Sequence, residues 1–153
     1  TRWMFEAILI TIEPSKRGED LVITKAQIIQ ALSERIPEAL VLRTVPNTSG
    51  KLHHNYSDTN PAYLDWEAAA WMAEVGIDHL LLDLPSVDRE VDEGELKAHR
   101  AFWNYPQAPR LNATITELIF VPDHVIDGEY TLNLQVAPIE NDAAPSRPVL
   151  YPK

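Results

Sequence analysis

The spacing of apolar residues in the first third of the chain predicts a strand followed by a helix. Residues 3–13 are almost all apolar, which predicts a strand covered on both faces and therefore central in its sheet. Residues 14–20 are rich in charge and predict a turn. Thr24 and Gln27 form a capping-box pattern at the start of a helix over residues 24–35. The apolar residues that this helix is expected to bury are Ile28, Ile29 and Leu32.

The pattern continues through the rest of the chain. Residues 39–45 predict a second apolar strand, and a long irregular segment of residues 46–64 follows it. A helix over residues 65–75 begins at an Asp cap and ends before a Gly. Residues 77–84 predict a third apolar strand. Polar and apolar residues alternate over residues 130–136, which predicts a last strand with one face in water.

This order of elements predicts an α/β fold, with a mixed β-sheet and flanking helices, in a single domain over residues 1–153. The tail from Pro138 onward is rich in Pro and has no periodicity, so we expect it to wrap the surface or a partner subunit. No internal repeat and no linker divides the chain.

The candidate chemistry lies between the third strand and a further strand predicted over residues 114–120. Asp92 and Glu95 have the spacing of a helix start. In the helix that would follow, Leu96, His99 and Trp103 share one face, because they are spaced i, i+3 and i+7. His99 is therefore expected to point inward among large apolar side chains.

Alternation along the 114–120 strand places Glu117 on the same side as Ile115 and Ile119. Neither side of this strand carries another charge, so we expect it to be covered on both faces. An ionised carboxylate buried in this way costs several kcal/mol unless a partner or a metal compensates. His99 and Glu117 are thus candidate metal ligands or catalytic residues. The alternatives are a hydrogen-bonded core histidine and a glutamate that meets an arginine.

Other polar residues have less specific patterns. Asp83 is at the carboxyl end of the third strand, and Ser86 and Asp88 follow it in the loop, where open α/β sheets usually bind ligands. Ordinary turn roles are the alternative for each. His53 and His54 are neighbours in the long irregular segment and would point in opposite directions if extended, so we expect them to be solvated rather than to share a metal.

Bulk composition excludes several classes of function. The chain has 153 residues, of which 45% are apolar, as in a soluble globular protein. A net charge of −10 makes nucleic acids and anionic membranes poor partners. The lack of Cys excludes disulfides, thiol nucleophiles and thiolate metal ligands. No apolar run reaches the length of a membrane span and no signal-peptide pattern is present, so we expect a cytoplasmic protein. Phosphate-binding glycine loops and the Gly-x-Ser-x-Gly elbow are also missing.

Several of these stretches together resemble the cyclase family, the metal-dependent hydrolases that include bacterial kynurenine formamidase. The most specific is Ile77-Asp-His-Leu-Leu-Leu-Asp-Leu-Pro-Ser-Val-Asp-Arg-Glu90. Further matches are Arg43-Thr44, Tyr56-Ser57, Thr59-Asn60-Pro61, Leu96-Lys-Ala-His-Arg-Ala-Phe-Trp103, Ala113-Thr-Ile-Thr-Glu-Leu118 and Pro138-Ile-Glu-Asn-Asp-Ala143. The resemblance covers nearly the whole chain.

The resemblance implies a swivelling β/β/α domain, with a barrel-like mixed sheet and flanking helices, that forms homodimers or homotetramers. It implies a divalent metal, zinc or manganese, that activates water to attack a small-molecule formamide or cyclic amide, as in tryptophan catabolism. His99 and Glu117 match the two downstream metal positions of the family.

The chain departs from the family in one respect. The principal metal motif of the family, His-x-Gly-Thr-His-x-Asp, lies upstream of the region that Trp3 begins to match, and this sequence contains nothing like it. Two ligands do not hold a catalytic metal tightly. We therefore expect the domain to lack its N-terminal portion, with hydrolase activity in the complete protein and little in this chain alone. The alternative is an inactive truncated homologue that acts as a binding or scaffolding protein.

Overall fold

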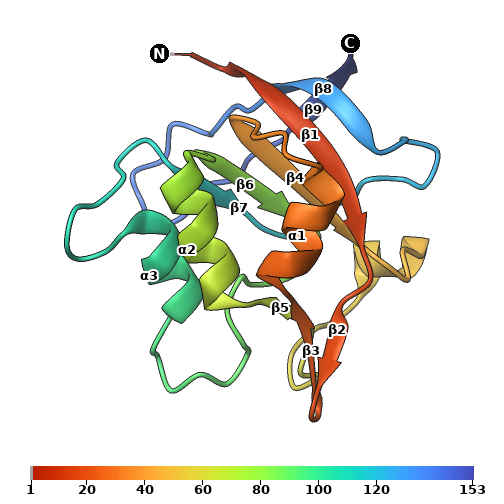
Figure 1. Ribbon diagram of the computed structural model, residues 1–153, viewed down its shortest axis with the longest axis vertical. Helices are drawn as coiled ribbons and strands as arrows, with labels where there is room; N and C mark the ends of the chain where they lie inside the picture. The colour runs from red at the N-terminus through yellow and green to blue at the C-terminus, as the bar shows by residue number, and fades with distance from the viewer. Residues whose placement is uncertain (1) are drawn as a thin grey trace.

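A six-stranded mixed sheet forms the centre of the computed structural model, which describes residues 2–153 (Figure 1). Its strands, in spatial order, are β7 (Thr114–Thr116), β6 (His79–Leu82), β4 (Ala39–Thr44), β1 (Met4–Ile12), β8 (Gly128–Asn133) and β9 (Val149–Pro152). The strands from β7 to β1 are parallel, whereas β8 and β9 are added antiparallel. The predicted α/β class with a mixed sheet is confirmed, and β1 is central as predicted.

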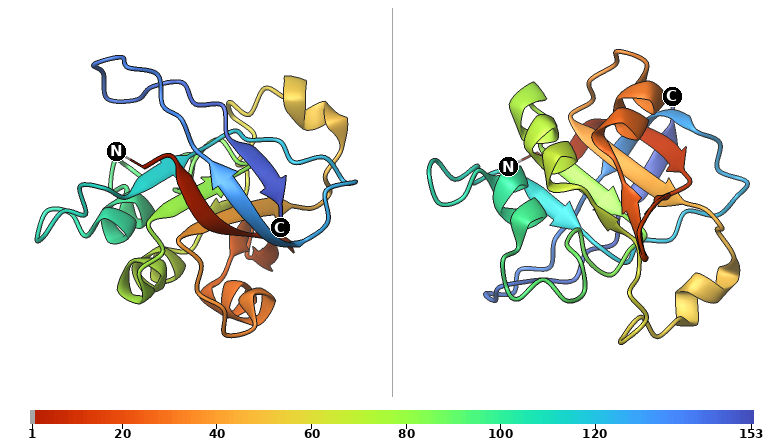
Figure 2. Two further views of the ribbon diagram at one scale, coloured as in Figure 1. Left: turned by 90° about the horizontal axis from the view of Figure 1, so that it is seen from above. Right: turned by 60° about the horizontal axis from the view of Figure 1, so that its bottom comes forward.

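All three α-helices cover the same face of this sheet. They are α1 (Lys25–Leu32), α2 (Trp66–Val75) and α3 (Lys97–Trp103). Seen from above, the helices lie on one side of the sheet and the segment between β8 and β9 reaches to the other side (Figure 2). Alternation along β4 and β6 divides the apolar side chains accordingly. Leu40, Leu42, Leu80 and Leu82 pack toward the helices, whereas Val41 and Leu81 belong to a second core on the opposite face.

The first helix forms largely as the sequence predicts. The Thr24 hydroxyl accepts a hydrogen bond from the Gln27 backbone, and the Gln27 side chain accepts one from the Thr24 backbone, so the capping box is complete. Ile28 and Leu32 are buried as expected, but the prediction for Ile29 is wrong because 40% of its surface is exposed. The helix is only eight residues long and packs along one narrow stripe, which leaves Ile29 on its flank.

A second, three-stranded sheet begins within residues 14–20, which were predicted to form only a charged turn. Its strands, in spatial order, are β2 (Ser15–Arg17), β3 (Asp20–Ile23) and β5 (Tyr63–Leu64). Every residue of β2 is exposed, so this strand has no apolar pattern to reveal it. Gly18, at φ +66°, makes the turn between β2 and β3. Arg17 then forms an ion pair of 2.5 Å with Asp65 at the start of α2.

The C-terminal tail does more than wrap the surface. Its last residues form β9, which pairs antiparallel with β8 and completes the sheet. An isolated bridge between Val136 and Ser146 joins the two arms of the connection. Prolines flank and end this short strand, so the sequence shows no strand period there. β9 therefore forms because the backbone of β8 has hydrogen-bonding groups free to pair with it, and not because of its own sequence pattern.

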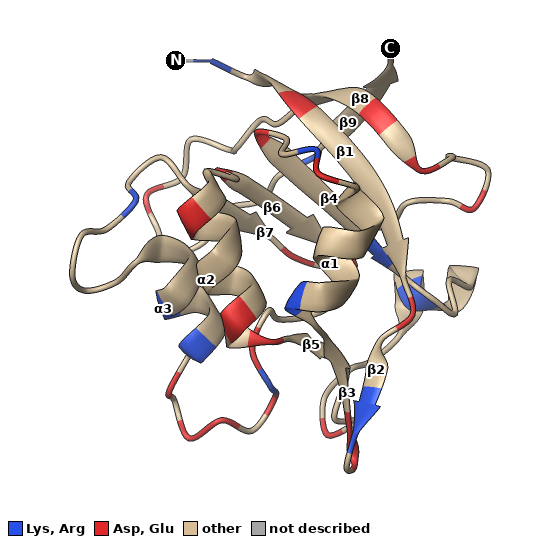
Figure 3. Ribbon diagram, in the orientation of Figure 1, with Lys and Arg blue, Asp and Glu red and all other residues tan. Residues whose placement is uncertain are grey.

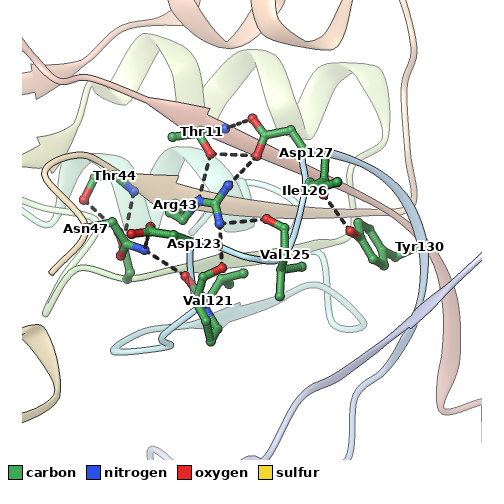
Figure 4. A network of polar contacts seen from close by, with 12 residues as sticks. Thr11, Arg43, Thr44, Asn47, Val121, Asp123, Val125, Ile126, Asp127 and Tyr130 are labelled. Carbon is green, nitrogen blue, oxygen red and sulfur yellow. Dashed lines mark hydrogen bonds and ion pairs between the residues drawn. The ribbon is translucent and has the colours of Figure 1, made fainter. Parts of the chain in front are cut away.

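Polar contacts tie the segment before β8 to the carboxyl ends of β1 and β4 (Figure 4). The buried guanidinium of Arg43 donates hydrogen bonds to the Thr11 hydroxyl and to the carbonyl oxygens of Pro122 and Val125, at 2.8–2.9 Å. It also forms a 2.8 Å ion pair with Asp127. These contacts hold the segment before β8 against the ends of β1 and β4.

The 3-10 helix η1 (Ser49–His53) interrupts the long segment after β4. The remainder of residues 46–62 has no regular structure, as predicted, whereas residues 63–64, which were predicted to belong to the same irregular segment, form β5. Both His53 and His54 are exposed. None of the helices formed by residues 2–153 has the length and apolar character needed to cross a bilayer.

Candidate functional site

His99 and Glu117 meet at the carboxyl ends of β6 and β7. The Nε2 atom of His99 lies 3.6 Å from Oε1 of Glu117, and their side chains are 19% and 29% exposed. The residues are far apart along the chain, and different elements bring them together: α3 carries His99, whereas Glu117 follows β7 directly. The two side chains that the sequence predicts to point inward therefore share one partly enclosed space.

The alternation predicted that Glu117 lies inside a strand, but it does not. β7 ends at Thr116, and Leu118 adopts a left-handed conformation with φ +56°. The turn at Leu118 breaks the alternation of side chains, so residues after it face the opposite side of the sheet from the side that alternation predicts. Ile115 packs against the core on the helical side, whereas Ile119 packs against the core on the other face, so the prediction that both share a side with Glu117 is wrong. The backbone N–H of Val87 donates a 3.0 Å hydrogen bond to Glu117 Oε1.

The helix that carries His99 begins later than predicted. α3 starts at Lys97, and the Asp92 carboxylate instead closes a turn by accepting hydrogen bonds from the backbone N–H groups of Gly94 and Leu96. Leu96 is 44% exposed and has φ +48°, so it does not join the buried face that was predicted for it. His99 and Trp103, one turn apart, do lie together, with ring centroids separated by 5.2 Å.

Asp88 holds the other side of the His99 ring. Its Oδ2 atom lies 2.6 Å from Nδ1 of His99, and its two oxygens accept hydrogen bonds from the backbone N–H groups of Ala98 and His99 at 2.6 and 3.3 Å. The sequence indicates that Asp88 lies in the loop after the third strand but gives no reason to pair it with His99. The two are eleven positions apart along the chain, and no local periodicity reports such a contact.

The two carboxyl groups that flank the imidazole differ in electrostatics. Burial raises the pKa of Glu117, and the nearby charge of Asp88 acts in the same direction, while the Val87 hydrogen bond and His99 oppose it. Burial would also raise the pKa of Asp88, but the hydrogen bonds from His99 and Ala98 outweigh it and lower that pKa. Asp88 is therefore held as the carboxylate, whereas Glu117 gains from a nearby positive charge.

The chemistry of these groups fits a divalent metal in part. An imidazole nitrogen and a carboxylate oxygen are both suitable zinc or manganese ligands. A histidine ligand commonly gives its other N–H to a carboxylate, and Asp88 is in hydrogen-bond distance of Nδ1 of His99. The fit stops at two ligands. Among residues 2–153, no group of three or more His, Asp or Glu side chains is placed to hold a metal ion.

Asp83 and Ser86 hold the surrounding loops. The buried Asp83 carboxylate accepts hydrogen bonds from the backbone and hydroxyl of Thr44 and pairs with Lys51. Ser86 accepts a hydrogen bond from the Asp88 backbone at 3.1 Å. These contacts fit the ordinary turn roles that the sequence offered as the alternative for both residues. Asp88 exceeds that expectation because it also touches His99.

Two hollows adjoin this region. One, of about 320 Å³, lies between the long segment and the loop after β6, and its lining includes Tyr56, Pro61, Ser86 and Asp88. The other, of about 690 Å³, lies against the helix-free face of the sheet. Its floor is apolar and includes Val41, Leu81, Val121 and Leu132, and Glu117 is at its edge.

The loop between Asp88 and α3 is predominantly acidic (Figure 3).

The sequence of the chain is similar to known proteins. Residues 1–89, more than half of the chain, match the model of a family described as “Putative cyclase”. The kynurenine formamidases of Bacillus mycoides and Bacillus anthracis are 36% and 35% identical to it over 116 residues. Each alignment covers 75% of this chain and 50% of the relative. The chain thus spans about half the length of the curated relatives that it matches.

Solved structures share the fold. A “predicted metal-dependent hydrolase” from Bacillus stearothermophilus matches with a TM-score of 0.69 at 19% identity, over 97% of this chain and 63% of that chain. An isatin hydrolase bound to the product analogue thioisatinate matches with a TM-score of 0.63 at 18% identity, over 97% and 61%. At such identities the likeness concerns the fold alone.

Proposed function

The chain belongs to the cyclase family, and we propose that it contributes to a metal-dependent hydrolase that cleaves the C–N bond of a small amide, as a kynurenine formamidase does. The names of the curated relatives support a formamide of an aromatic amine as substrate, which would place the reaction in tryptophan breakdown. Zinc and manganese are the metals that suit the nitrogen and oxygen donors of His99 and Glu117.

The observation that supports this proposal most directly is the approach of His99 Nε2 to within 3.6 Å of Glu117 Oε1. No arginine or lysine forms an ion pair with Glu117 among the contacts of residues 2–153. A partly buried carboxylate next to an imidazole nitrogen is a costly arrangement unless a positive charge joins it. The site is therefore built to receive a cation.

Each residue has a role that its contacts support. His99 and Glu117 would hold the metal, which when bound polarises the amide carbonyl and lowers the pKa of water. The Val87 N–H keeps Glu117 Oε1 in place. The hollow lined by Tyr56 and Ser86 also includes Asp88, the contact of His99, and offers room for a small substrate.

The test combines metal content with turnover of N-formylkynurenine, measured after incubation with Zn²⁺ or Mn²⁺. We expect His99→Gln and Glu117→Gln each to lower the metal affinity and the turnover. Each loss should exceed the roughly 10- to 100-fold that follows when a residue supporting a metal ligand is removed. His53→Gln is the matched control, because His53 is an exposed histidine on η1. Equal metal content in the wild type and in both variants would refute the assignment of these ligands.

A second candidate function is that of an inactive homologue that serves as a binding or scaffolding protein. The observation that favours it is the shortage of ligands, since the described residues bring together only His99 and Glu117. If wild-type protein of confirmed mass shows no bound metal and no turnover, that result would support this alternative against the hydrolase.

A further inference from the structure

Asp88 contacts both the beginning of α3 and the ring of the histidine that α3 carries. Its Oδ1 atom accepts the Ala98 N–H at 2.6 Å, and its Oδ2 atom accepts the His99 N–H at 3.3 Å. The same Oδ2 lies 2.6 Å from Nδ1 of His99. Asp88 itself is only 7% exposed, so water does not compete strongly for these bonds. One carboxylate thus binds the backbone and the side chain of His99 together.

The helix needs this carboxylate because it has no cap of its own. Leu96 occupies the N-cap position, where it offers no side-chain acceptor. The first backbone N–H groups of a helix lack partners within the helix and are normally satisfied by a Ser, Thr, Asp or Asn at that position. Asp88 takes this role from the preceding loop. The position of His99 in the first turn therefore depends on Asp88.

The ring contact also decides which imidazole nitrogen carries the proton. Both oxygens of Asp88 already accept hydrogen bonds from backbone N–H groups, so this side chain faces the ring as an acceptor with no proton to give. Nδ1 must then be the protonated nitrogen in the neutral ring. Its other nitrogen, Nε2, keeps its lone pair and faces Glu117 Oε1 at 3.6 Å. Trp103 packs beside the ring and limits its rotation.

From these contacts we infer that Asp88 is the positioning residue that selects Nε2 of His99 as the metal-facing nitrogen. The inference rests on the proposed function only for the identity of the cation. The tautomer and the ring orientation follow from the hydrogen bonds and would exist without any metal. Asp88 acts here through His99, and nothing in the contacts requires it to touch substrate.

The substitution Asp88→Asn separates the two contacts. The amide oxygen of the new side chain could still accept a backbone N–H at the start of α3. Its NH₂ group would then face Nδ1 and favour the neutral ring with the proton on Nε2, which removes the lone pair from the side of Glu117. Asp92→Asn is the matched control, because Asp92 also accepts two backbone N–H groups in the adjoining turn.

The experiment is ¹⁵N NMR of the His99 ring in the metal-free protein, followed by titration with Zn²⁺ alone. In the wild type and in D92N we expect the neutral ring to be protonated on Nδ1, and in D88N on Nε2. We expect the affinity for Zn²⁺ to fall roughly 10- to 100-fold in D88N and to change little in D92N. Asp88→Glu, which keeps a carboxylate, should restore the wild-type tautomer and guards against a D88N protein that does not fold.

The outcomes separate the two ideas. An unchanged tautomer in folded D88N, or an equal change in D92N, would overturn the role of Asp88. A tautomer change in D88N without Zn²⁺ binding or turnover in the wild type would support Asp88 as the positioning residue and count against the proposed hydrolase.

Discussion

The ammonium group of Lys51 lies 2.7 Å from the Oδ2 atom of Asp83, and the Asp83 side chain has no exposed surface. Lys51 is on η1 in the long irregular segment, whereas Asp83 follows β6. The Thr44 backbone and hydroxyl donate to the same carboxylate at 2.9 Å. This ion pair anchors the segment that carries Tyr56 to the ends of two core strands.

Replacing Lys51 by Met should therefore destabilise the protein strongly. The change leaves the buried Asp83 carboxylate without its cation, and breaking a buried pair from one side typically costs about 3–5 kcal/mol. Urea unfolding measures the effect. Lys97→Met is the control, because the Lys97 pair with Glu95 is largely exposed and should contribute little to stability. Similar losses for both would show that burial of Asp83 does not decide the cost.

Arg43 should prove important for the segment before β8. In Arg43→Met, the Pro122 and Val125 carbonyls and the Asp127 carboxylate lose their common donor (Figure 4). We expect a loss of about 2–4 kcal/mol in the free energy of unfolding. Hydrogen exchange should show faster local opening there. Arg35→Gln, at an exposed pair of 3.5 Å with Glu129, should change stability by about 0.5 kcal/mol or less, and a larger effect would contradict this ranking.

Phe102 is the largest fully buried side chain of α3 and packs in the core between the helices and the sheet. Phe102→Ala should cost about 3–5 kcal/mol, because a cavity replaces the ring. Thermal or urea unfolding measures this loss. Leu111→Ala is the control, since Leu111 is 91% exposed and its truncation should stay within about 0.5 kcal/mol. Comparable effects at the two sites would contradict the packing described for α3.

His79 should make stability depend on pH. Burial lowers its pKa, and Arg2 and Arg110 act in the same direction, whereas Asp78 and Glu38 oppose it. On acidification, His79 is therefore protonated near pH 6.5 in the unfolded chain, whereas in the folded protein it is protonated only at lower pH. This contribution to stability is complete above about pH 6.5 and is lost as the pH falls from there toward the lowered pKa.

The check is urea unfolding of the wild type and of His79→Gln between about pH 7.5 and 5, a range that spans the ordinary pKa of histidine. The wild type should lose stability on acidification in this range, and the variant should lose less. His53→Gln, at an exposed histidine, should keep the wild-type slope. A slope that is equal in all three proteins would mean that His79 is not held neutral.

The parts of the fold that could be predicted are those with strong local signals. β1 and β4 are continuous apolar runs, α1 has a capping box, and Gly76 ends α2 at φ +87°. The inward direction of His99 was also readable, because it is a polar residue within an apolar pattern, whereas the direction of Glu117 was predicted from a strand that ends before it. Their roles as metal ligands remain predictions.

Other parts had no local signal. β2 is fully exposed and β9 lies among prolines, so each forms only because a neighbouring strand offers hydrogen bonds. The left-handed Leu118, which reverses the phase after Glu117, is not a residue type that favours φ +56°. Its conformation follows from hydrogen bonds of the backbone, such as the one from Leu118 to Leu84 at 3.0 Å.

The order of strands and helices, and the residues able to carry chemistry, follow from the amino acids because apolar periodicity and caps act over a few positions. The partnership of Asp88 with His99, and the 3.6 Å approach of His99 to Glu117, depended on the folded chain. Such contacts join loops across the sheet, and the energy that holds them comes from burial and electrostatics in three dimensions, which no spacing along the chain records.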